Sequence, residues 1–458
     1  MISRARQAAF DALCIIAAGK ADLGDALSRT RDRLEDARDR ALATELVLGT
    51  LRTRAAIDYQ LQRFSTRLLS RLDGPVLDAL RLAAYQILYL PRQPVSAVVN
   101  DAVSMVKAAK LRSAAPFANA VLRRLARDRD ELLWPARPTD SNGAEDRPVL
   151  AEFLSITYSH PVWLVNRWLE RYGAPATEEW LRFNNRPPAL TLATNRLRTT
   201  RDDLAAKLLA EGVQTSPTTV APHGLTVVSG QVLGTKTFRE GFCLIQDEAS
   251  QLVAELVDAR GARVVLDACA SPGGKTLALA AQIETHGRVV AADVRRRRVR
   301  LLADTLQRCQ ARSVRVVQTA ASGPLPFAAG AFDRVLVDAP CSGLGTVRRD
   351  PDIRWRRTEA DLPVLGQLQR DLLYRVAPTV AAGGRIIYST CSSEPEENEE
   401  VVTAFLADHA DFRVLPIGSI ASVPNRVRDL STAMGFFRSD PTVGLEAFFA
   451  AVLERQSN

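Results

Sequence analysis

The sequence predicts a multidomain protein with an all-α N-terminal bundle, a small α+β module and a C-terminal α/β domain. The first 130 or so residues carry apolar residues at spacings of three and four and almost no strand signal, which is typical of amphipathic helices. Residues 135–149 are rich in Pro, Asp, Ser, Asn and Gly and show no periodicity, as linkers do. From about residue 241 onward, apolar runs alternate with helix-sized intervals. We expect domains at residues 1–134, 150–240 and 241–458, with a linker at 135–149.

Prolines mark the helix boundaries of the N-terminal bundle. Pro75 and Pro94 stand where helices would start, and Pro91 stands where one would end. The pattern after Pro94 divides into two helices near residues 113–116, so we expect five to seven helices in all. The α+β module that follows is expected to hold a helix at 161–173, a strand at 189–195 and a helix at 200–212.

Apolar runs predict the strands of the C-terminal domain. Strands that are apolar along almost their whole length, with helices between them, indicate a parallel sheet covered on both faces. In such sheets ligands bind outside the carboxyl ends of the strands, and the short polar motifs of this domain fall there. The runs lie at 262–269, 287–294, 313–319, 332–340 and 383–390.

The charge balance favours a polyanionic partner. The chain of 458 residues has a formal net charge of +8 and a pI of about 9.4, which suits nucleic acid. Nearly all the basic charge is arginine, so a GC-rich genome explains it equally well. The run "RRRRVR" at 295–300 is either a phosphate-binding patch or a solvated helix face, and the second interpretation is slightly favoured.

Several functional classes are disfavoured. The cysteines are scattered, with no CxxC pair and no Cys/His cluster, so we expect neither a metal site nor a disulfide framework. Asp11 interrupts the weakly apolar start of the chain, which favours a helix face over a signal peptide. No window reaches 18 uninterrupted apolar residues. A cytoplasmic protein without a membrane span is therefore expected.

The first strand of the C-terminal domain leads into a glycine-containing loop, "DACASPGGKT", at residues 267–276. Glycines let the backbone approach a ligand at the N-terminus of a helix. A Walker A loop would need glycine at the position of Cys269, which disfavours a nucleoside triphosphatase. Asp293 ends the second strand, where a carboxylate suits the hydroxyls of a ribose. Together these features favour a cofactor that contains adenosine.

Two cysteines follow later strands of the same sheet. Asp338 and Cys341 lie in "VDAPCSG" after the fourth run, and Cys391 lies in "YSTCSSEPEEN" after the fifth. A lone cysteine in such a place is usually a small core residue. Two of them at adjacent strand ends, each in a loop of small residues, favour a site that faces a ligand. The acidic run after Cys391 is expected to lie near the N-terminus of a helix, where negative charge is favourable.

A cysteine thiolate is a soft nucleophile suited to an electron-poor ring carbon, such as C6 of a pyrimidine. Addition there makes C5 an enamine carbon that can attack an electrophilic methyl group. An acid near N3 would stabilise the charge that develops on the ring, and Asp338 is placed to do so. A base must then remove the C5 proton so that the thiol can leave, and the second cysteine would assist in that step.

The motifs "DACASPGGKT", "VLVDAPCSGLGTVRRDPDIRW" and "YSTCSSEPEENEE" resemble those of RNA cytosine-5 methyltransferases that use S-adenosylmethionine. "FCLIQDEASQLV" resembles the segment that leads into their catalytic domain, and "EAFFAAVLER" their closing strand. The N-terminal helices resemble NusB, an RNA-binding antitermination factor. The combination is similar to the bacterial RsmB (Fmu/Sun) family of 16S rRNA methyltransferases. This resemblance implies a NusB-like bundle followed, after the small module, by a Rossmann-like class I methyltransferase domain.

The resemblance also implies a role for each site residue. Cys391 would be the nucleophile, Cys341 would assist product release, and Asp338 would be the acid or N3 contact and would line both pockets. Asp293 would hold the ribose hydroxyls of S-adenosyl-L-methionine. The other residues implied to bind this cofactor are Cys269, Ala270, Ser271, Pro272, Gly273, Gly274, Lys275 and Thr319.

Three positions depart from the family pattern. The third strand usually ends in an aspartate that contacts the adenine, whereas Thr319 and Ala320 stand here. A threonine hydroxyl would replace part of that contact, with weaker cofactor binding. Ser271 replaces the usual alanine, which should have a mild effect, and "LEAFF" lacks the Asp-Gly pair that normally precedes the two phenylalanines. None of these changes removes a catalytic group.

The expected function is methylation of C5 of one cytosine in 16S rRNA, in a hairpin loop of the small-subunit head, through a covalent cysteine adduct at C6. The partner would be 16S rRNA, free or in an early small-subunit particle, and the protein would act as a monomer. Two alternatives stay open. One is the same chemistry on tRNA or 23S rRNA. The other is a non-catalytic NusB-like RNA-binding factor, which only the missing third-strand aspartate favours.

Overall fold

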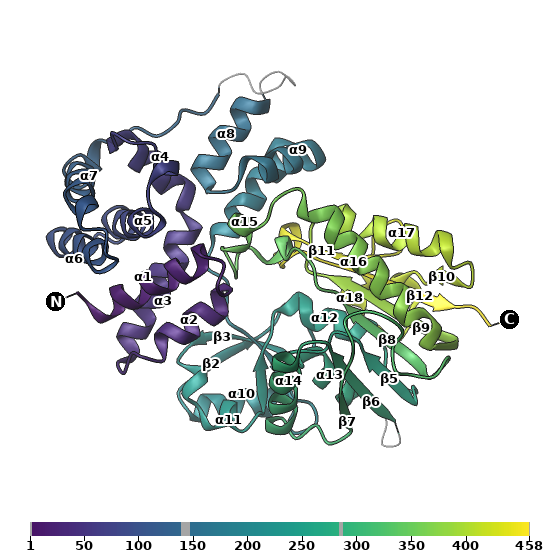
Figure 1. The fold of residues 1–458 in the computed structure, drawn as a ribbon. Helices are drawn as coiled ribbons and strands as arrows, with labels where there is room; N and C mark the ends of the chain where they lie inside the picture. The colour runs from purple at the N-terminus through teal and green to yellow at the C-terminus, as the bar shows by residue number, and fades with distance from the viewer. Residues whose placement is uncertain (1, 139–146, 284–286, 458) are drawn as a thin grey trace. The chain divides into compact units, whose positions relative to one another are not determined.

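The computed structural model describes residues 2–138, 147–283 and 287–457 (Figure 1). Most of the expected linker at 135–149 therefore lies outside the described residues. The chain forms two compact units, one of Met1–Arg186 with Val347–Glu359 and the other of Pro187–Thr346 with Ala360–Asn458. The segment Val347–Glu359 therefore belongs to the first unit, although along the chain it lies between the two parts of the second unit. The domain bounds expected from the sequence remain predictions.

The first unit begins with the predicted helical bundle. Pro75 lies in the first turn of α5, Pro94 precedes α6, and Pro91 follows the end of α5, as expected. The division expected near residues 113–116 falls between α6 and α7. Leucine, valine, isoleucine and alanine side chains from these helices form one buried core. The helices are α1 (Arg4–Ala17), α2 (Leu23–Arg31), α3 (Ala37–Arg52), α4 (Arg54–Phe64), α5 (Gly74–Tyr89), α6 (Val95–Ala108) and α7 (Ala115–Arg127).

Two longer helices and the inserted segment complete the first unit. The second of these helices bends at Gly173, whose φ of 74° interrupts it. Arg354 of the inserted segment is fully buried, and its NH1 donates to Asn185 Oδ1 at 2.9 Å. The neighbouring Trp355 donates through Nε1 to Leu51 O at 2.7 Å. The insertion is therefore held by side chains inside the unit. The helices are α8 (Arg147–Tyr158), α9 (Val162–Asn185) and α15 (Ile353–Arg356).

The second unit begins with a four-stranded antiparallel sheet in the order β2-β3-β1-β4. Strand β1 is the strand expected at 189–195, and α10 is the helix expected at 200–212. The side chain of Thr200 caps α10, and Leu192 packs on Leu204 in a small core. The elements are β1 (Thr191–Thr194), α10 (Arg201–Ala210), β2 (Gln214–Pro217), β3 (Gly224–Ser229), α11 (Lys236–Arg239) and β4 (Cys243–Ile245).

The rest of the second unit is built on a larger sheet in the order β10-β12-β9-β8-β5-β6-β7, with β11 paired to β12. The five predicted strands form its parallel part, from β9 to β7. The closing strand β12 runs antiparallel to β9. The predicted Rossmann-like domain is confirmed. The strands are β5 (Val264–Asp267), β6 (Arg288–Asp293), β7 (Val314–Gln318), β8 (Phe332–Asp338), β9 (Val380–Thr390), β10 (Phe412–Val414), β11 (Phe437–Ser439) and β12 (Phe448–Arg455).

Helices cover both faces of the larger sheet (Figure 1). Val265 of β5 belongs to a core shared with α12, α13 and α14, whereas its neighbour Leu266 belongs to a core shared with α16 and α17. Alternate side chains point to opposite faces of a sheet, so burial of both faces explains the nearly continuous apolar runs. The helices are α12 (Glu248–Leu256), α13 (Gly274–Gln282), α14 (Arg296–Arg308), α16 (Asp361–Val376), α17 (Glu399–Asp408) and α18 (Asn425–Arg428).

None of the helices in the described parts of the chain is long and apolar enough to cross a bilayer.

Candidate active site

The two cysteines that follow neighbouring strands meet in the structure. Cys341 follows β8 and Cys391 follows β9, and these strands pair with Asp338 opposite Ser389. The two Sγ atoms lie 3.2 Å apart, within hydrogen-bonding distance. The hydrogen bond with Cys391, followed by burial, raises the pKa of Cys341 well above that of an ordinary thiol. The two thiols therefore form one site, not two separate core positions.

Position 345 requires glycine because backbones meet there. Gly345 N donates to Cys391 O at 2.9 Å, and Ala447 N donates to Gly345 O at 3.0 Å. A Cβ at this position would lie 2.0 Å from Ala447 O and 2.9 Å from Cys391 O, which no side chain can do without a shift of the backbone. The loop after Cys341, the loop of Cys391 and the residue before β12 thus fix one another.

Asp338 lies between the cysteines and the predicted cofactor loop. Lys275 Nζ donates to its Oδ2 at 2.7 Å, and Ser389 Oγ donates to its Oδ1 at 3.0 Å. A charged donor at this distance compensates a carboxylate in a partly buried place. Lys275 Nζ also lies 5.7 Å from the centre of the Phe448 ring, in the "LEAFF" segment. Asp338 is therefore fixed from both sides of the site.

A pocket of about 300 Å³ opens beside the predicted cofactor loop. Gly273 precedes α13 with a φ of 110°, a conformation that favours glycine. A Cβ on Gly274 would come within 3.1 Å of the side-chain amide of Gln246 on the opposite wall, so this glycine permits a close approach. Gln246 itself was not singled out from the sequence. The predicted site residues that line the pocket are Cys269, Ala270, Ser271, Pro272, Gly274, Lys275 and Asp338.

Asp267, the last residue of β5, also lines the pocket and was not predicted as a site residue. Thr276 Oγ1 donates to its Oδ2 at 2.6 Å, while its buried Oδ1 has no hydrogen-bond partner within the described residues. Burial, only partly offset by the hydrogen bond from Thr276, raises the pKa of Asp267 to about 7. A buried acceptor without a partner in a pocket wall suits a cationic group of a ligand. The sequence feature that could have indicated Asp267 is its position at the end of β5, directly before the cofactor loop.

Asp293 is buried at the end of β6 and contacts the cofactor loop, but neither it nor Gly273 is among the residues that line the pocket. Its Oδ1 accepts from Arg295 N at 3.2 Å, and its Oδ2 accepts from Ser271 N at 3.4 Å. Arg298 Nε pairs with Oδ2 at 3.1 Å, and Arg298 NH2 donates to Ser271 O at 2.7 Å. The arginine run is therefore not only a solvated helix face, because Arg298 joins the end of β6 to the loop. The sequence showed the run but not which member turns inward.

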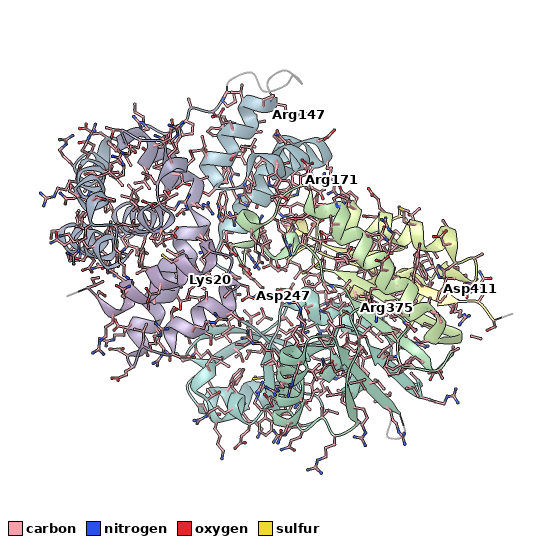
Figure 2. The ribbon with its side chains drawn as sticks, in the orientation of Figure 1. Lys20, Arg147, Arg171, Asp247, Arg375 and Asp411 are labelled. Atoms are coloured by element: carbon pink, nitrogen blue, oxygen red, sulfur yellow. The ribbon has the colours of Figure 1, made fainter. Side chains whose placement is uncertain are left out.

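Thr319, at the third-strand position where the resemblance implies an aspartate, lies beside Asp293 and does not line the pocket. Its backbone N donates to Asp293 O at 3.1 Å. Arg375, near the end of α16, is labelled in Figure 2. It holds the backbone after Thr319 by donating to Ala320 O and Ala321 O at 2.8 and 3.1 Å. The loop after β7 is thus supported from a helix that follows much later in the sequence.

The acidic run after Cys391 divides into two parts. Glu399 and Glu400 lie in the first turn of α17, where they were expected. Glu397 ends a short 3₁₀ turn and, like Glu394 before it, is fully buried instead. The glutamates of this run share one local pattern, so the sequence carried no signal for the difference.

Within the described ranges, no three His, Cys, Asp or Glu side chains gather in a way that would hold a metal ion.

Three family models match successive parts of the chain. They are the NusB family at residues 3–127, the ferredoxin-like domain of RsmF/B-like methyltransferases at 160–232, and the 16S rRNA methyltransferase RsmB/F at 254–454. The ferredoxin-like match covers much of the expected α+β module. The order of these matches is the order predicted from the sequence.

Individual proteins agree with the family models. The chain is 36% identical over 375 residues to a probable ribosomal RNA small subunit methyltransferase B of Bacillus subtilis, covering 82% of this chain and 81% of that one. It is 33% identical over 419 residues to the ribosomal RNA small subunit methyltransferase B of Pseudomonas putida, covering 91% and 92%.

Among solved structures, the crystal structure of PH0851 matches with a TM-score of 0.81 and 25% identity, covering 99% of this chain and 98% of that one. The predicted fold and the predicted cofactor, S-adenosylmethionine, are confirmed by these likenesses. The extent and identity of the matches show that this chain belongs to the RsmB family of S-adenosylmethionine-dependent ribosomal RNA small subunit methyltransferases.

Proposed function

We propose that this protein transfers the methyl group of S-adenosyl-L-methionine to C5 of a cytosine in 16S rRNA, through a covalent adduct between Cys391 and C6 of the base. The observation that carries the proposal is the 3.2 Å separation of the Cys341 and Cys391 sulfurs, beside Asp338 at adjacent strand ends. Two thiols and a carboxylate are the groups that addition to a pyrimidine, and release from it, require. The rRNA methyltransferase relatives support the choice of substrate.

The residues around the pocket fit this cofactor. Asp267 Oδ1, which has no partner within the described residues, would accept a hydrogen bond from the cofactor's ammonium group. Asp293, held in place by Arg298, would bind the ribose hydroxyls. The backbone at Gly273 and Gly274 would lie against the ligand at the start of α13. The cofactor supplies a methyl group on a positively charged sulfur, which is the electrophile that C5 needs.

The electrostatics support different roles for the two thiols. The raised pKa of Cys341 keeps it protonated, so it donates the hydrogen bond when Cys391 is a thiolate. The Cys391 sulfur then adds an electron pair to C6, and the C5–C6 π electrons become available at C5. Asp338, acting as the acid, would give a proton to N3 as negative charge develops on the ring, and Lys275 would stabilise the carboxylate that remains. C5 would take the methyl group as the cofactor's bond between sulfur and methyl breaks, with that electron pair kept by the sulfur. One proton is then left on C5 and must be removed.

Cys341 is positioned to take this proton. The hydrogen bond with Cys391 is the largest cause of its raised pKa, and that cause disappears once Cys391 is bonded to C6 as a thioether. Cys341 can then release its own proton to bulk water and act as the base. Removal of the C5 proton restores the C5–C6 double bond and expels the Cys391 sulfur as a thiolate. The same residue thus stabilises the nucleophile before the reaction and releases the product after it.

The test is transfer of labelled methyl groups to unmethylated 16S rRNA by the purified protein and its variants. Cys391→Ala is expected to abolish transfer, whereas Cys341→Ala should accumulate a protein–RNA adduct that is stable to denaturing electrophoresis. Cys14→Ala, which changes a cysteine of the first unit, is the matched control. Full activity of Cys391→Ala would refute the nucleophile, and turnover by Cys341→Ala without an adduct would refute the release role.

We also propose that the protein acts as a monomer in the cytoplasm, on 16S rRNA that is free or in an early small-subunit particle. The NusB match supports RNA binding by the N-terminal bundle. Bisulfite sequencing of RNA from a strain that lacks the gene identifies the target. Loss of one 16S rRNA signal supports the proposal, while loss confined to tRNA or 23S rRNA would replace it with the alternative substrate.

A further inference from the structure

A buried glutamate joins the two cysteine loops. Glu397 Oε1 accepts from Ser342 N at 2.7 Å and from Gln369 Nε2 at 3.0 Å. Its Oε2 accepts from Ser342 Oγ and from Ser392 Oγ, both at 2.5 Å. Ser342 directly follows Cys341, and Ser392 directly follows Cys391. A single carboxylate therefore holds the next residue of each loop, and the two serine hydroxyls lie 3.1 Å apart.

The same network reaches the residues that precede the cysteines. Gln369 of α16 donates through Nε2 to Pro340 O at 3.0 Å as well as to Glu397. Asn398, next to Glu397, accepts from Thr390 Oγ1 at 2.5 Å and donates to Ser392 O at 3.0 Å. Pro340 precedes Cys341 and Thr390 precedes Cys391. Each cysteine is thus held on both sides by bonds that converge on Glu397 and its neighbour.

Burial makes it costly to break any of the hydrogen bonds to Glu397. Glu397 is fully buried, and a buried carboxylate is costly unless its oxygens are bonded. Its four donors are all neutral, and they match the roughly four acceptor positions of a carboxylate. Displacement of either loop would leave one of these positions unsatisfied. The glutamate therefore opposes any movement of one loop relative to the other.

We propose that Glu397 is a positioning residue of the two-cysteine reaction, which keeps the Cys341 and Cys391 sulfurs within reach of each other by holding Ser342 and Ser392. The proposal rests on the function proposed above and deepens it. Glu397 does not touch the reacting atoms. Glu397 instead sets the distance between the Cys341 sulfur and the cytosine that is bonded to Cys391, across which Cys341 must act as a base.

Three variants separate geometry from charge. Glu397→Gln keeps the shape and one carbonyl oxygen for Ser342 N and Gln369 Nε2, while the serine hydroxyls can rotate to accept from its new amide. Glu397→Ala removes every bond to the loops. Glu400→Ala changes an exposed glutamate of the same acidic run and is the matched control. Positioning predicts that Glu397→Gln restores most of what Glu397→Ala loses.

The thiol separation can be measured without RNA or cofactor, so this test is independent of the proposed activity. Dibromobimane joins two nearby thiols, each of which displaces one bromide, and it becomes strongly fluorescent when both have reacted. Trypsin then releases Cys341 in residues 335–348 and Cys391 in residues 386–413, so mass spectrometry identifies this pair. We expect bridging in the wild type, Glu397→Gln and Glu400→Ala, and a several-fold loss in Glu397→Ala. Unchanged bridging in Glu397→Ala would overturn the proposal.

Kinetics provide the second measurement. With unmethylated 16S rRNA, Glu397→Ala is expected to lose on the order of 10²-fold in kcat with little change in KM, and to accumulate the same adduct as Cys341→Ala. Equal losses in Glu397→Gln and Glu397→Ala would overturn a geometric role. If Glu397→Ala proves too unstable to purify, Ser392→Ala removes one of the four donors and should show a smaller loss of bridging. The two proposals can fail separately. If bridging follows these expectations but the wild type methylates no RNA, the proposed methyltransferase function is refuted while the positioning role of Glu397 stands.

Discussion

The two ends of the site are built in opposite ways. Around the cysteines, Glu397 and Gly345 fix the loops through buried hydrogen bonds and contacts between backbones. Around the cofactor loop, Asp267 keeps one oxygen without a partner within the described residues, and Asp293 depends on Arg298, which is 45% exposed. Groups that make and break bonds need fixed geometry, whereas a binding site must keep acceptors open for its ligand. Substitutions at the cysteine end should therefore lower the rate, and those at the cofactor end should lower the affinity.

The largest effect on the reaction is expected from Gly345→Ala, which changes the rigid loops around the two cysteines. The new Cβ would lie 2.0 Å from Ala447 O, so the loops beside Cys391 must separate. A displacement of this kind is expected to lower kcat on the order of 10²-fold while the affinity for S-adenosylmethionine is kept. Single-turnover methylation and calorimetry measure the two quantities. Gly418→Ala, where a Cβ meets nothing within 4 Å, is the control, and equal rates in both variants would contradict the comparison.

Asp267→Asn tests the open end. Loss of a charged acceptor facing the cofactor's ammonium group should weaken binding by about 1.5–3 kcal/mol, or roughly ten- to a hundredfold in Kd. Because burial raises the pKa of Asp267 to about 7, wild-type affinity should also increase as the pH rises through that value. Calorimetry across this pH range checks both, with the exposed Asp304→Asn as control. A pH-independent Kd in the wild type would count against a contact with Asp267.

Asp267 also affects the stability of the cofactor-free protein. Its pKa is raised from 3.8 to about 7 in the folded protein, so the folded state binds more protons than the unfolded chain between these values. The free energy of unfolding should therefore fall as the pH rises through this window, by about 1.4 kcal/mol for each pKa unit. Asp267→Asn should remove that slope and raise the Tm of the cofactor-free protein above pH ~7. If the Tm of the wild type and of the variant changed with pH in the same way, burial would not raise the pKa of Asp267.

The smallest effect is expected from Thr319→Asp, which restores the acid that the family pattern has after the third strand. Thr319 lies beside Asp293, and one added hydrogen bond should improve cofactor binding by about 0.5–1.5 kcal/mol, roughly two- to tenfold. Thr319→Val, which keeps the shape but loses the hydroxyl, should bind more weakly than the wild type. Calorimetry compares the three proteins. Identical affinities would mean that this strand end does not reach the cofactor.

Much of this architecture could be predicted because it follows from local patterns. Near-continuous apolar runs indicated strands buried on both faces, and the pairing of β8 with β9 then brought Cys341 and Cys391 together. The helices of the bundle were marked by spacing and by prolines such as Pro75. Likewise the glycines at 273 and 274 signalled a loop that approaches another surface closely.

The rest depends on which of several similar residues turns inward. Arg298 lies in a run of arginines and Glu397 in a run of glutamates. Only tertiary contacts show that Arg298 bonds to the cofactor loop and that Glu397, one of two fully buried glutamates of its run, bonds to both cysteine loops. Asp267 ends a strand as many acidic residues do, and its unusual property is an oxygen in a pocket wall that has no hydrogen-bond partner among the residues that the structure describes. Hydrogen-bond satisfaction is a three-dimensional property, so no sequence period reports it.

The insertion of Val347–Glu359 into the helical unit has a consequence for gene exchange. The boundaries of the two units cross the chain three times, after Arg186, Thr346 and Glu359. A hybrid gene joined at a single point near Arg186 would place Arg354 and Trp355, which bond to Asn185 and Leu51 here, against foreign helices. Recombination between relatives should succeed only when this segment is inherited with the N-terminal part. We therefore expect the residues just after the Cys341 loop to be inherited together with the helices and not with the sheet that carries the cysteine.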